Sequence, residues 1–110
     1  AGSCLTEAAR RHGLRAADEA FCDRRYEPGG TLRSRKLPDA LVVDPEEAAR
    51  QACRIVLEGR VQTSAGTDVA LRAQTLCIHG DSPNAPAIAA AVRARLEAAG
   101  VRLMSLEHLV

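Results

Sequence analysis

The sequence has almost no aromatic side chains. Among its 110 residues there is one phenylalanine, Phe21, one tyrosine, Tyr26, and no tryptophan. Base stacking, a carbohydrate platform and a membrane-interface belt all need more rings than these two. The charges nearly cancel as well, with 15 basic and 14 acidic residues and a net charge of +1. No basic excess is left to drive counterion release, so we expect neither a nucleic acid nor a membrane as partner.

Long apolar runs and paired cysteines are also missing. No apolar stretch approaches the ~18–20 residues of a membrane-spanning helix, and residues 1–7 lack the basic and apolar pattern of a signal peptide. The four cysteines are scattered, with no C-x-x-C pair, which argues against a zinc site. We expect reduced cysteines, no metal site and a cytoplasmic location.

The composition that remains is globular, with 46% apolar and 26% charged residues. The length allows one domain at most. Alanine dominates the apolar set, so few bulky side chains are present to build a core. We therefore expect residues 1–110 to form either a single domain that leans on another chain or a part of a larger domain.

The spacing of apolar residues and the positions of glycine and proline predict a mixed α/β order of helices and strands. Predicted helices cover residues 3–12, 44–59 and 82–99, and predicted strands cover 14–21, 41–43 and 75–78. Residues 61–63 and 69–71 flank a Gly-containing loop and predict a hairpin. Residues 22–40 are irregular, and 101–103 are a further strand or an extended tail.

Two helix starts carry strong signals. Asp44 precedes Pro45 and Ser82 precedes Pro83, the N-cap and first-position pattern of a helix. The predicted buried face of the second helix consists of Ala48, Ala49, Ala52, Cys53 and Val56. That of the last helix consists of Ala85, Ile88, Ala89, Val92, Leu96 and Ala99. The apolar run 75–78 is typical of a strand covered on both faces.

Polar side chains collect where the strand 75–78 ends. His79 exchanges protons near neutral pH, and Asp81 can orient it or act as a base. Ser82 lies beside them at a helix N-terminus, which favours an anion. The alternative is structural, with Asp81 and Ser82 capping the helix and His79 serving as a satisfied polar residue.

A second group follows the strand 14–21. Asp23 and Arg24, with Glu19 and Tyr26 nearby, can hold a carboxylate or phosphate of a substrate. A structural salt bridge that fixes the long loop explains the same residues. Cys22 is a weaker candidate nucleophile, because only arginines are near enough to activate it. The basic cluster Arg33, Arg35 and Lys36 is typical of a solvated loop.

Two stretches together resemble a known family. Residues 19–26, Glu-Ala-Phe-Cys-Asp-Arg-Arg-Tyr, followed by Gly30-Thr31-Leu32 and Arg35, are similar to the "E-x-F-A-D-R-x-Y…G-x-L…R" block of the LamB/YcsF family. Residues 75–83 are similar to its "T-x-C-x-H-G-D-[ST]-P" block. The resemblance covers essentially the whole chain but only the C-terminal part of the family's proteins. Departures inside it are Cys22 for a usual Ala, Asp39 for Gly and Asn84 for a frequent Gly.

The resemblance implies a fold and an activity. The implied fold is the C-terminal portion of an irregular (β/α) barrel of the glycoside hydrolase and deacetylase type, completed by an N-terminal half outside this chain. The implied activity is that of the A subunit of a 5-oxoprolinase, which with other subunits uses ATP to hydrolyse 5-oxo-L-proline to L-glutamate. On this basis His79 and Asp81 are the expected proton-transfer pair and Arg24 the carboxylate holder. Glu19, Asp23, Tyr26 and Ser82 complete the expected substrate site.

Two other classes of function remain open at this point. In the first, the chain is a non-catalytic binding or assembly module whose apolar helix faces dock on a partner chain. In the second, it is a fragment of a deacetylase-like, metal-dependent hydrolase. The second has little support, because His79 and Asp81 have no third obvious ligand in this stretch.

Overall fold

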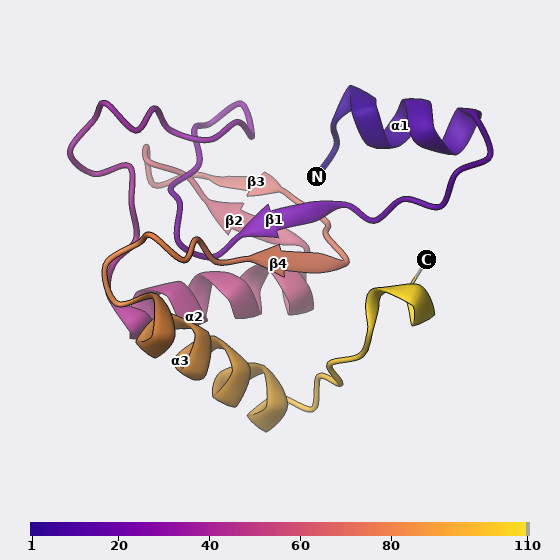
Figure 1. The fold of residues 1–110 in the computed structure, drawn as a ribbon. Helices are drawn as coiled ribbons and strands as arrows, with labels where there is room; N and C mark the ends of the chain where they lie inside the picture. Colours follow the sequence, from indigo (N-terminus) through magenta and orange to yellow (C-terminus); the bar gives the residue numbers. More distant parts are fainter. Residues whose placement is uncertain (110) are drawn as a thin grey trace.

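The computed structural model describes residues 1–109 and has the mixed α/β character that the sequence predicts (Figure 1). The helices are α1 (Cys4–Arg11), α2 (Pro45–Cys53) and α3 (Ala85–Ala98), and the strands are β1 (Glu19–Phe21), β2 (Arg60–Gln62), β3 (Asp68–Ala70) and β4 (Thr75–Cys77). A π-helical turn, Arg54–Glu58, extends α2, and a 3-10 turn, Leu106–His108, lies near the C-terminus.

β1 and β4 form a two-stranded parallel sheet in which Phe21 pairs with Cys77. The predicted strand 14–21 is too long, since only its last three residues are in the sheet. The backbone N–H of Asp18 donates instead to the side-chain oxygen of Gln74, at 2.9 Å. β4 is half-buried along its length in the described residues, so the predicted coverage of both faces is only partial. Residues 14–18 have no partner strand among residues 1–109.

The hairpin is confirmed to within one residue. β2 and β3 are antiparallel, with Val61 opposite Val69. The predicted strand 41–43 is reduced to a single bridge between Arg24 and Leu41. Residues 101–103 form an extended tail and no strand.

α2 begins as predicted, because the carboxylate of Asp44 accepts from the backbone N–H of Glu47 at 3.2 Å. Its far end differs from the prediction. The π-helical turn brings Ile55 into the core and leaves Val56 exposed, so placing Val56 on the buried face was wrong. A π turn takes more residues than an α turn and shifts the faces that follow it.

α3 begins at Ala85, not at the predicted Ser82. Asn84 precedes it in the left-handed region, with φ 63°, which asparagine tolerates better than most non-glycine residues. The hydroxyl of Ser82 bonds instead to the side chain of Asp23. The buried stripe is confirmed for Ala85, Ile88, Val92 and Leu96, whereas Ala89 and Ala99 are exposed.

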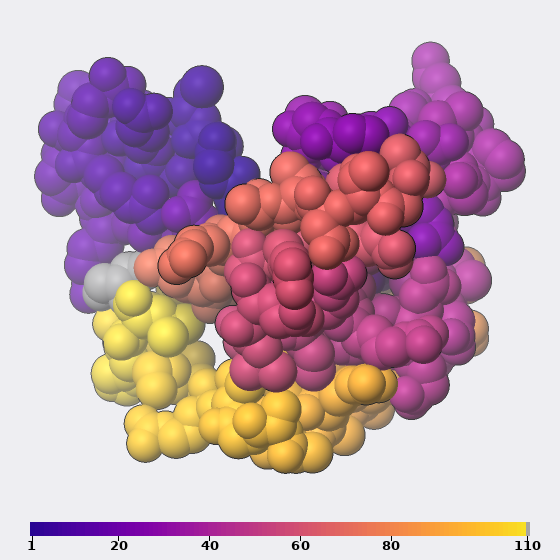
Figure 2. Space-filling model, turned by 180° about the vertical axis from the view of Figure 1, so that it is seen from behind, coloured from indigo at the N-terminus to yellow at the C-terminus, as the bar shows by residue number. Residues whose placement is uncertain are grey.

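Two apolar clusters make up the core. In the first, the alanines of α2 pack against Ile88, Val92 and Leu96 of α3, and the two helices lie side by side beneath the sheet (Figure 1). The second surrounds the hairpin and consists of Ala20, Tyr26, Ile55, Val61 and Leu71. α1 belongs to neither cluster. It has no buried residue and projects from the rest of the molecule, as Figure 2 shows from behind.

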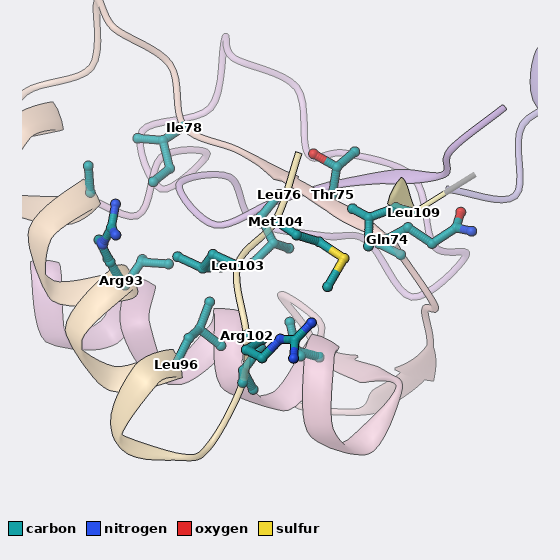
Figure 3. A pocket seen from close by; sticks show the side chains of 15 residues that line it. Gln74, Thr75, Leu76, Ile78, Arg93, Leu96, Arg102, Leu103, Met104 and Leu109 are labelled. Atoms are coloured by element: carbon teal, nitrogen blue, oxygen red, sulfur yellow. The ribbon is translucent and has the colours of Figure 1, made fainter. Parts of the chain in front are cut away.

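A largely apolar groove of about 310 Å³ separates β4 and α3 from the C-terminal tail (Figure 3). Leu76 and Ile78 line one side, Leu96 the floor, and Leu103 and Met104 the tail side. The charged residues in its lining are Arg93 and Arg102, and no acid or histidine joins them among residues 1–109. The groove therefore lacks groups for proton transfer. Within the same residues, no helix is both long and apolar enough to span a membrane.

Candidate active site at the ends of β1 and β4

The parallel pairing of β1 with β4 brings Asp23 and His79 together. The two strands end together at Phe21 and Cys77, and two residues beyond these ends Asp23 and His79 are in contact. The ring Nδ1 of His79 is 2.9 Å from Oδ1 of Asp23, and the backbone N–H of His79 donates to Oδ2 at 2.7 Å. The carboxyl ends of adjacent parallel strands thus hold a carboxylate and an imidazole in direct contact.

The Asp23 carboxylate is fully buried and well supplied with donors. Besides the two groups of His79, the hydroxyl of Ser82 donates to Oδ2 at 3.0 Å. Burial alone would raise the pKa of Asp23, but the bonds from the His79 backbone, the His79 ring and Ser82 outweigh it and lower the pKa below its usual value. Asp23 is therefore ionised at neutral pH.

An ionised carboxylate only accepts hydrogen bonds, so Nδ1 of His79 must carry the proton between them. In the neutral ring the lone pair is then on Nε2, for which no protein partner exists among residues 1–109. Phe21 stacks on the ring, with centroids 5.3 Å apart and planes 12° from parallel. The side chain remains 24% exposed. This geometry presents a fixed, accessible base, the arrangement that general-base catalysis needs.

Side chains also hold the turn that follows β1. The backbone N–H of Phe21 donates to the hydroxyl of Tyr26 at 3.0 Å, and the side-chain amide of Gln51 donates to the carbonyl of Phe21 at 2.9 Å. Burial raises the pKa of the Tyr26 phenol. Tyr26, expected at the substrate, thus lies in the core and bonds to the backbone.

The other predicted binding residues lie apart from the pair. Arg24 is 7% exposed and donates from Nη2 to the carbonyl of Arg33 at 2.8 Å, while its buried Nε has no partner among the described residues. Glu19 is exposed at the first position of β1, the end of the strand opposite to Asp23. Neither side chain bonds to Asp23 or His79 in the described part of the chain.

Asp81 is close to His79 in sequence but does not bond to it in residues 1–109. Its side chain is 77% exposed, and its Oδ2 is 3.9 Å from Nη1 of Arg35. The partner of His79 is Asp23, which sequence proximity did not suggest. The signal that could have found it is strand register, because two strands aligned at Phe21 and Cys77 place Asp23 beside His79.

The structure gives no support to Cys22 as a nucleophile. Its thiol is fully buried, and burial, with a contribution from the charge of Asp23, raises its pKa to about 12. A thiol with such a pKa is protonated at neutral pH and unreactive.

Residues 1–109 hold no cluster of metal ligands, and their loop arginines contact protein groups. Among residues 1–109, no group of three or more His, Cys, Asp or Glu side chains is placed to hold a metal ion. The arginines of the loop 22–40 are engaged by protein groups: Arg24 by the carbonyl of Arg33, Arg25 by Glu47, Arg33 by Glu27 and Asp39, and Arg35 by Asp81. The Arg35–Asp81 pair is the loosest of these contacts, at 3.9 Å between two exposed side chains.

An α/β fold with a buried carboxylate–imidazole pair at the carboxyl ends of parallel strands is an arrangement typical of enzymes. Comparison with known proteins gives the particular family. The sequence profile of the LamB/YcsF family matches residues 1–110, and the chain belongs to this family.

Several relatives carry a functional name. A protein of Thermus thermophilus, named as the A subunit of 5-oxoprolinase, is 54% identical over 102 residues, which are 93% of this chain and 41% of the relative. A protein of Shouchella clausii with the same name is 46% identical over 92% of this chain and 40% of the relative. The chain therefore spans about two fifths of the length of these relatives.

A solved structure is also similar. The crystal structure of a lactam utilization protein from Thermus thermophilus superposes with a TM-score of 0.86 at 50% identity. It covers 96% of this chain, and the chain covers 41% of it.

Proposed function

We propose that this chain is the C-terminal part of the A subunit of a 5-oxoprolinase, and that the assembled enzyme hydrolyses 5-oxo-L-proline to L-glutamate at the expense of ATP. Membership of the LamB/YcsF family and the names of the relatives support the proposal. A relative that is named as one subunit of an enzyme implies further subunits as partners. The location that suits this activity is the cytoplasm.

The observation that carries the proposal is the 2.9 Å contact between Nδ1 of His79 and the buried carboxylate of Asp23. His79 is the general base, and Asp23 holds the ring so that Nε2 faces the substrate. Transfer of the γ-phosphoryl group of ATP to the lactam oxygen, elsewhere in the assembled enzyme, would release ADP and activate the ring carbon. Water gives a proton to Nε2 and its oxygen attacks that carbon, the ring C–N bond breaks, and the nitrogen takes up a proton to become the amine. A second water would then split the resulting γ-glutamyl phosphate into glutamate and phosphate. Asp23 replaces Asp81 as the orienting carboxylate in this scheme.

The remaining candidate residues have supporting roles. Ser82 fixes the Asp23 carboxylate through its hydroxyl. Arg24 is assigned to the substrate carboxylate only through the family resemblance, because its side chain is buried and donates to the carbonyl of Arg33. Asp81, two residues after His79 in sequence, is exposed and lies near Arg35, so we assign it a role in the second proton transfer only through the family resemblance. Glu19 and Tyr26 are assigned to the substrate site only through the family resemblance.

ATP supplies the driving force for opening a resonance-stabilised amide. Because the loop arginines are engaged by protein groups, we assign nucleotide binding to the partner subunits or to the N-terminal half of the same protein. That half would complete the irregular (β/α) barrel. The coverage supports this, because the chain spans only about two fifths of its relatives' length and the outer edges of the β1–β4 sheet have no partner strand among residues 1–109.

The test uses the intact subunit, meaning the complete protein to which this chain contributes the C-terminal part. It is mixed with its partner subunits, ATP and 5-oxo-L-proline, and glutamate is measured. Glutamate that forms only when every component is present supports the proposal. Absence of glutamate from a folded, fully assembled mixture would overturn it.

A second candidate, a non-catalytic assembly module, is favoured by one observation. The N-terminal segment exposes Leu5 at 78% and Leu14 at 64%. Substitution of both leucines by serine, compared with His79→Ala, separates the two candidates. A non-catalytic module predicts that the leucine variant loses assembly and turnover while assembled His79→Ala keeps its turnover. Loss of turnover in assembled His79→Ala removes the argument for a module.

A further inference from the structure

The side chain of Gln51 reaches from α2 to the backbone on both sides of Asp23. Its Nε2 donates to the carbonyl of Phe21 at 2.9 Å and to the carbonyl of Arg24 at 2.8 Å. The carbonyl of Cys22 lies further away, at 3.5 Å. No residue of the candidate site is adjacent to Gln51 in sequence, and no sequence pattern selects it.

These bonds use the whole donor capacity of the amide, which has two N–H groups. They connect the residue two positions before Asp23 with the residue immediately after it. The Phe21 N–H is also taken, by the hydroxyl of Tyr26. The backbone N–H and carbonyl of Phe21 are therefore both bonded to side chains and not to a further strand. The chain turns directly after them, where Asp23 contacts His79.

Gln51 is well placed for this task because it lies on a helix. The neighbouring Ala48, Ala49 and Ala52 are fully or almost fully buried against the core. A side chain anchored on a packed helix defines a position more tightly than one on a loop. The Asp23 carboxylate is therefore positioned by a rigid element rather than by the long irregular loop that follows it.

We propose that Gln51 is a positioning residue that sets the Asp23–His79 geometry by fixing the turn at residues 21–24. The inference rests on the proposed function of this pair. It assigns Gln51 no contact with the substrate. The alternative is that Gln51 only satisfies buried carbonyls and contributes stability alone.

Gln74 provides a matched control for that alternative. Its side-chain oxygen accepts from the backbone N–H of Asp18 at 2.9 Å, so it also links a glutamine to the backbone beside β1. It lies at the opposite ends of β1 and β4 from Asp23 and His79. Gln74→Leu therefore removes a comparable bond without touching the turn at 21–24.

The first readout is turnover by the intact subunit in complex with its partners. Gln51→Leu should lower kcat by about 10- to 100-fold with little change in KM, because misplacement of a reacting group by about 1 Å can cost this much. Gln74→Leu should leave kcat within a few-fold of the original. Equal losses in the two variants, or no loss in Gln51→Leu, would overturn the proposal.

The second readout is the nitrogen NMR signature of the His79 ring, which needs no turnover. The original protein should show the proton fixed on Nδ1, and Gln51→Leu should show a mixture of the two tautomers. An unchanged signal in Gln51→Leu would overturn the proposal even if kcat fell. Because this signal is read without substrate, it tests Gln51 even if the intact enzyme releases no glutamate and the proposed function fails.

A third variant tests the donor role directly. Gln51→Glu keeps the shape of the side chain but replaces both N–H donors, so kcat at neutral pH should fall at least as far as in Gln51→Leu. Protonation of the new carboxyl restores one donor, so activity relative to the original protein should recover as the pH is lowered. If the kcat of Gln51→Glu relative to that of the original protein does not change with pH, hydrogen-bond donation is not the role of Gln51.

Discussion

The carboxylate of Asp23 and the imidazole of His79 are 56 residues apart in sequence and 2.9 Å apart in space. Two adjacent parallel strands bring them together, and Ser82 and the His79 backbone supply the other donors to the carboxylate. The buried acid therefore stays ionised and fixes the proton on Nδ1 of the ring. In the intact subunit, changes to either partner or to the groups around them should have measurable consequences.

Asp23→Asn should lower kcat by about 10²- to 10⁴-fold, because the wrong tautomer of His79 removes the contribution of the general base. The amide can present an N–H to the ring, which favours the tautomer with its lone pair on Nδ1 and leaves Nε2 protonated. Steady-state glutamate release measures the effect. Asp39→Asn, a change in an exposed ion pair with Arg33, is the control. Comparable activity of the two variants would contradict the role of Asp23.

The same carboxylate should make stability depend on pH. Its pKa is lower in the folded protein than in the unfolded chain, so the unfolded chain binds the proton more tightly. The stabilisation is complete above the unfolded value of about 3.9 and is lost as the pH falls through the folded value. In urea unfolding, Asp23→Asn should cost about 1.5–3 kcal/mol at pH 7 and progressively less below pH 4. A cost that stays constant between pH 7 and pH 3 would contradict the lowered pKa.

Phe21 should stabilise the ring of His79 by stacking. Phe21→Leu removes the aromatic face but keeps an apolar side chain, and should cost about 0.5–1.5 kcal/mol of stability together with some loss of kcat. Phe21→Tyr keeps the ring and serves as the control. Thermal unfolding and turnover are measured on both variants. If the leucine variant matched the tyrosine variant in both, stacking would have no role.

Cys22 should be dispensable for the chemistry. Its buried thiol has a pKa raised to about 12, so Cys22→Ala should retain near-normal turnover. Alkylation followed by mass spectrometry should modify the exposed Cys4 well before Cys22. Rapid modification of Cys22, or loss of turnover in Cys22→Ala, would contradict this prediction and support Cys22 as a nucleophile.

Asn84 should tolerate glycine better than alanine. Its φ of 63° is in the left-handed region, where an alanine is strained by roughly 1–2 kcal/mol and a glycine is not. Thermal unfolding of Asn84→Gly and Asn84→Ala compares the two directly. Equal stability of the variants would contradict the backbone conformation at this position.

The sequence was a good guide where local rules decide the structure. The Asp44 cap, the hairpin and the stripe of Ile88, Val92 and Leu96 follow from caps, turn residues and periodicity, and the structure confirms them. Local rules failed at Ser82, whose hydroxyl bonds to the distant Asp23 instead of capping α3. They also failed at the strand 14–21, whose extent depends on neighbours that the described chain does not supply.

The candidate site was predictable as a set of residues but not as a set of contacts. Asp23, His79 and Ser82 were each selected because polar groups at strand ends carry function. Their pairing depends on strand register, which the sequence does not specify. Proximity in sequence favoured Asp81, whereas packing turned its side chain to the surface near Arg35. Gln51 gave no signal, because its role depends on where α2 lies against β1.

The most direct test of the account is glutamate release by the intact subunit carrying His79→Ala, in complex with its partners and supplied with ATP and 5-oxo-L-proline. His108→Ala, which changes a histidine in the exposed 3-10 turn near the C-terminus, is the matched control. The account predicts that His79→Ala folds and assembles but loses turnover by at least about 10²-fold, while His108→Ala is unaffected. Near-normal turnover in a folded His79→Ala variant would contradict the assignment of Asp23 and His79 as the hydrolytic pair.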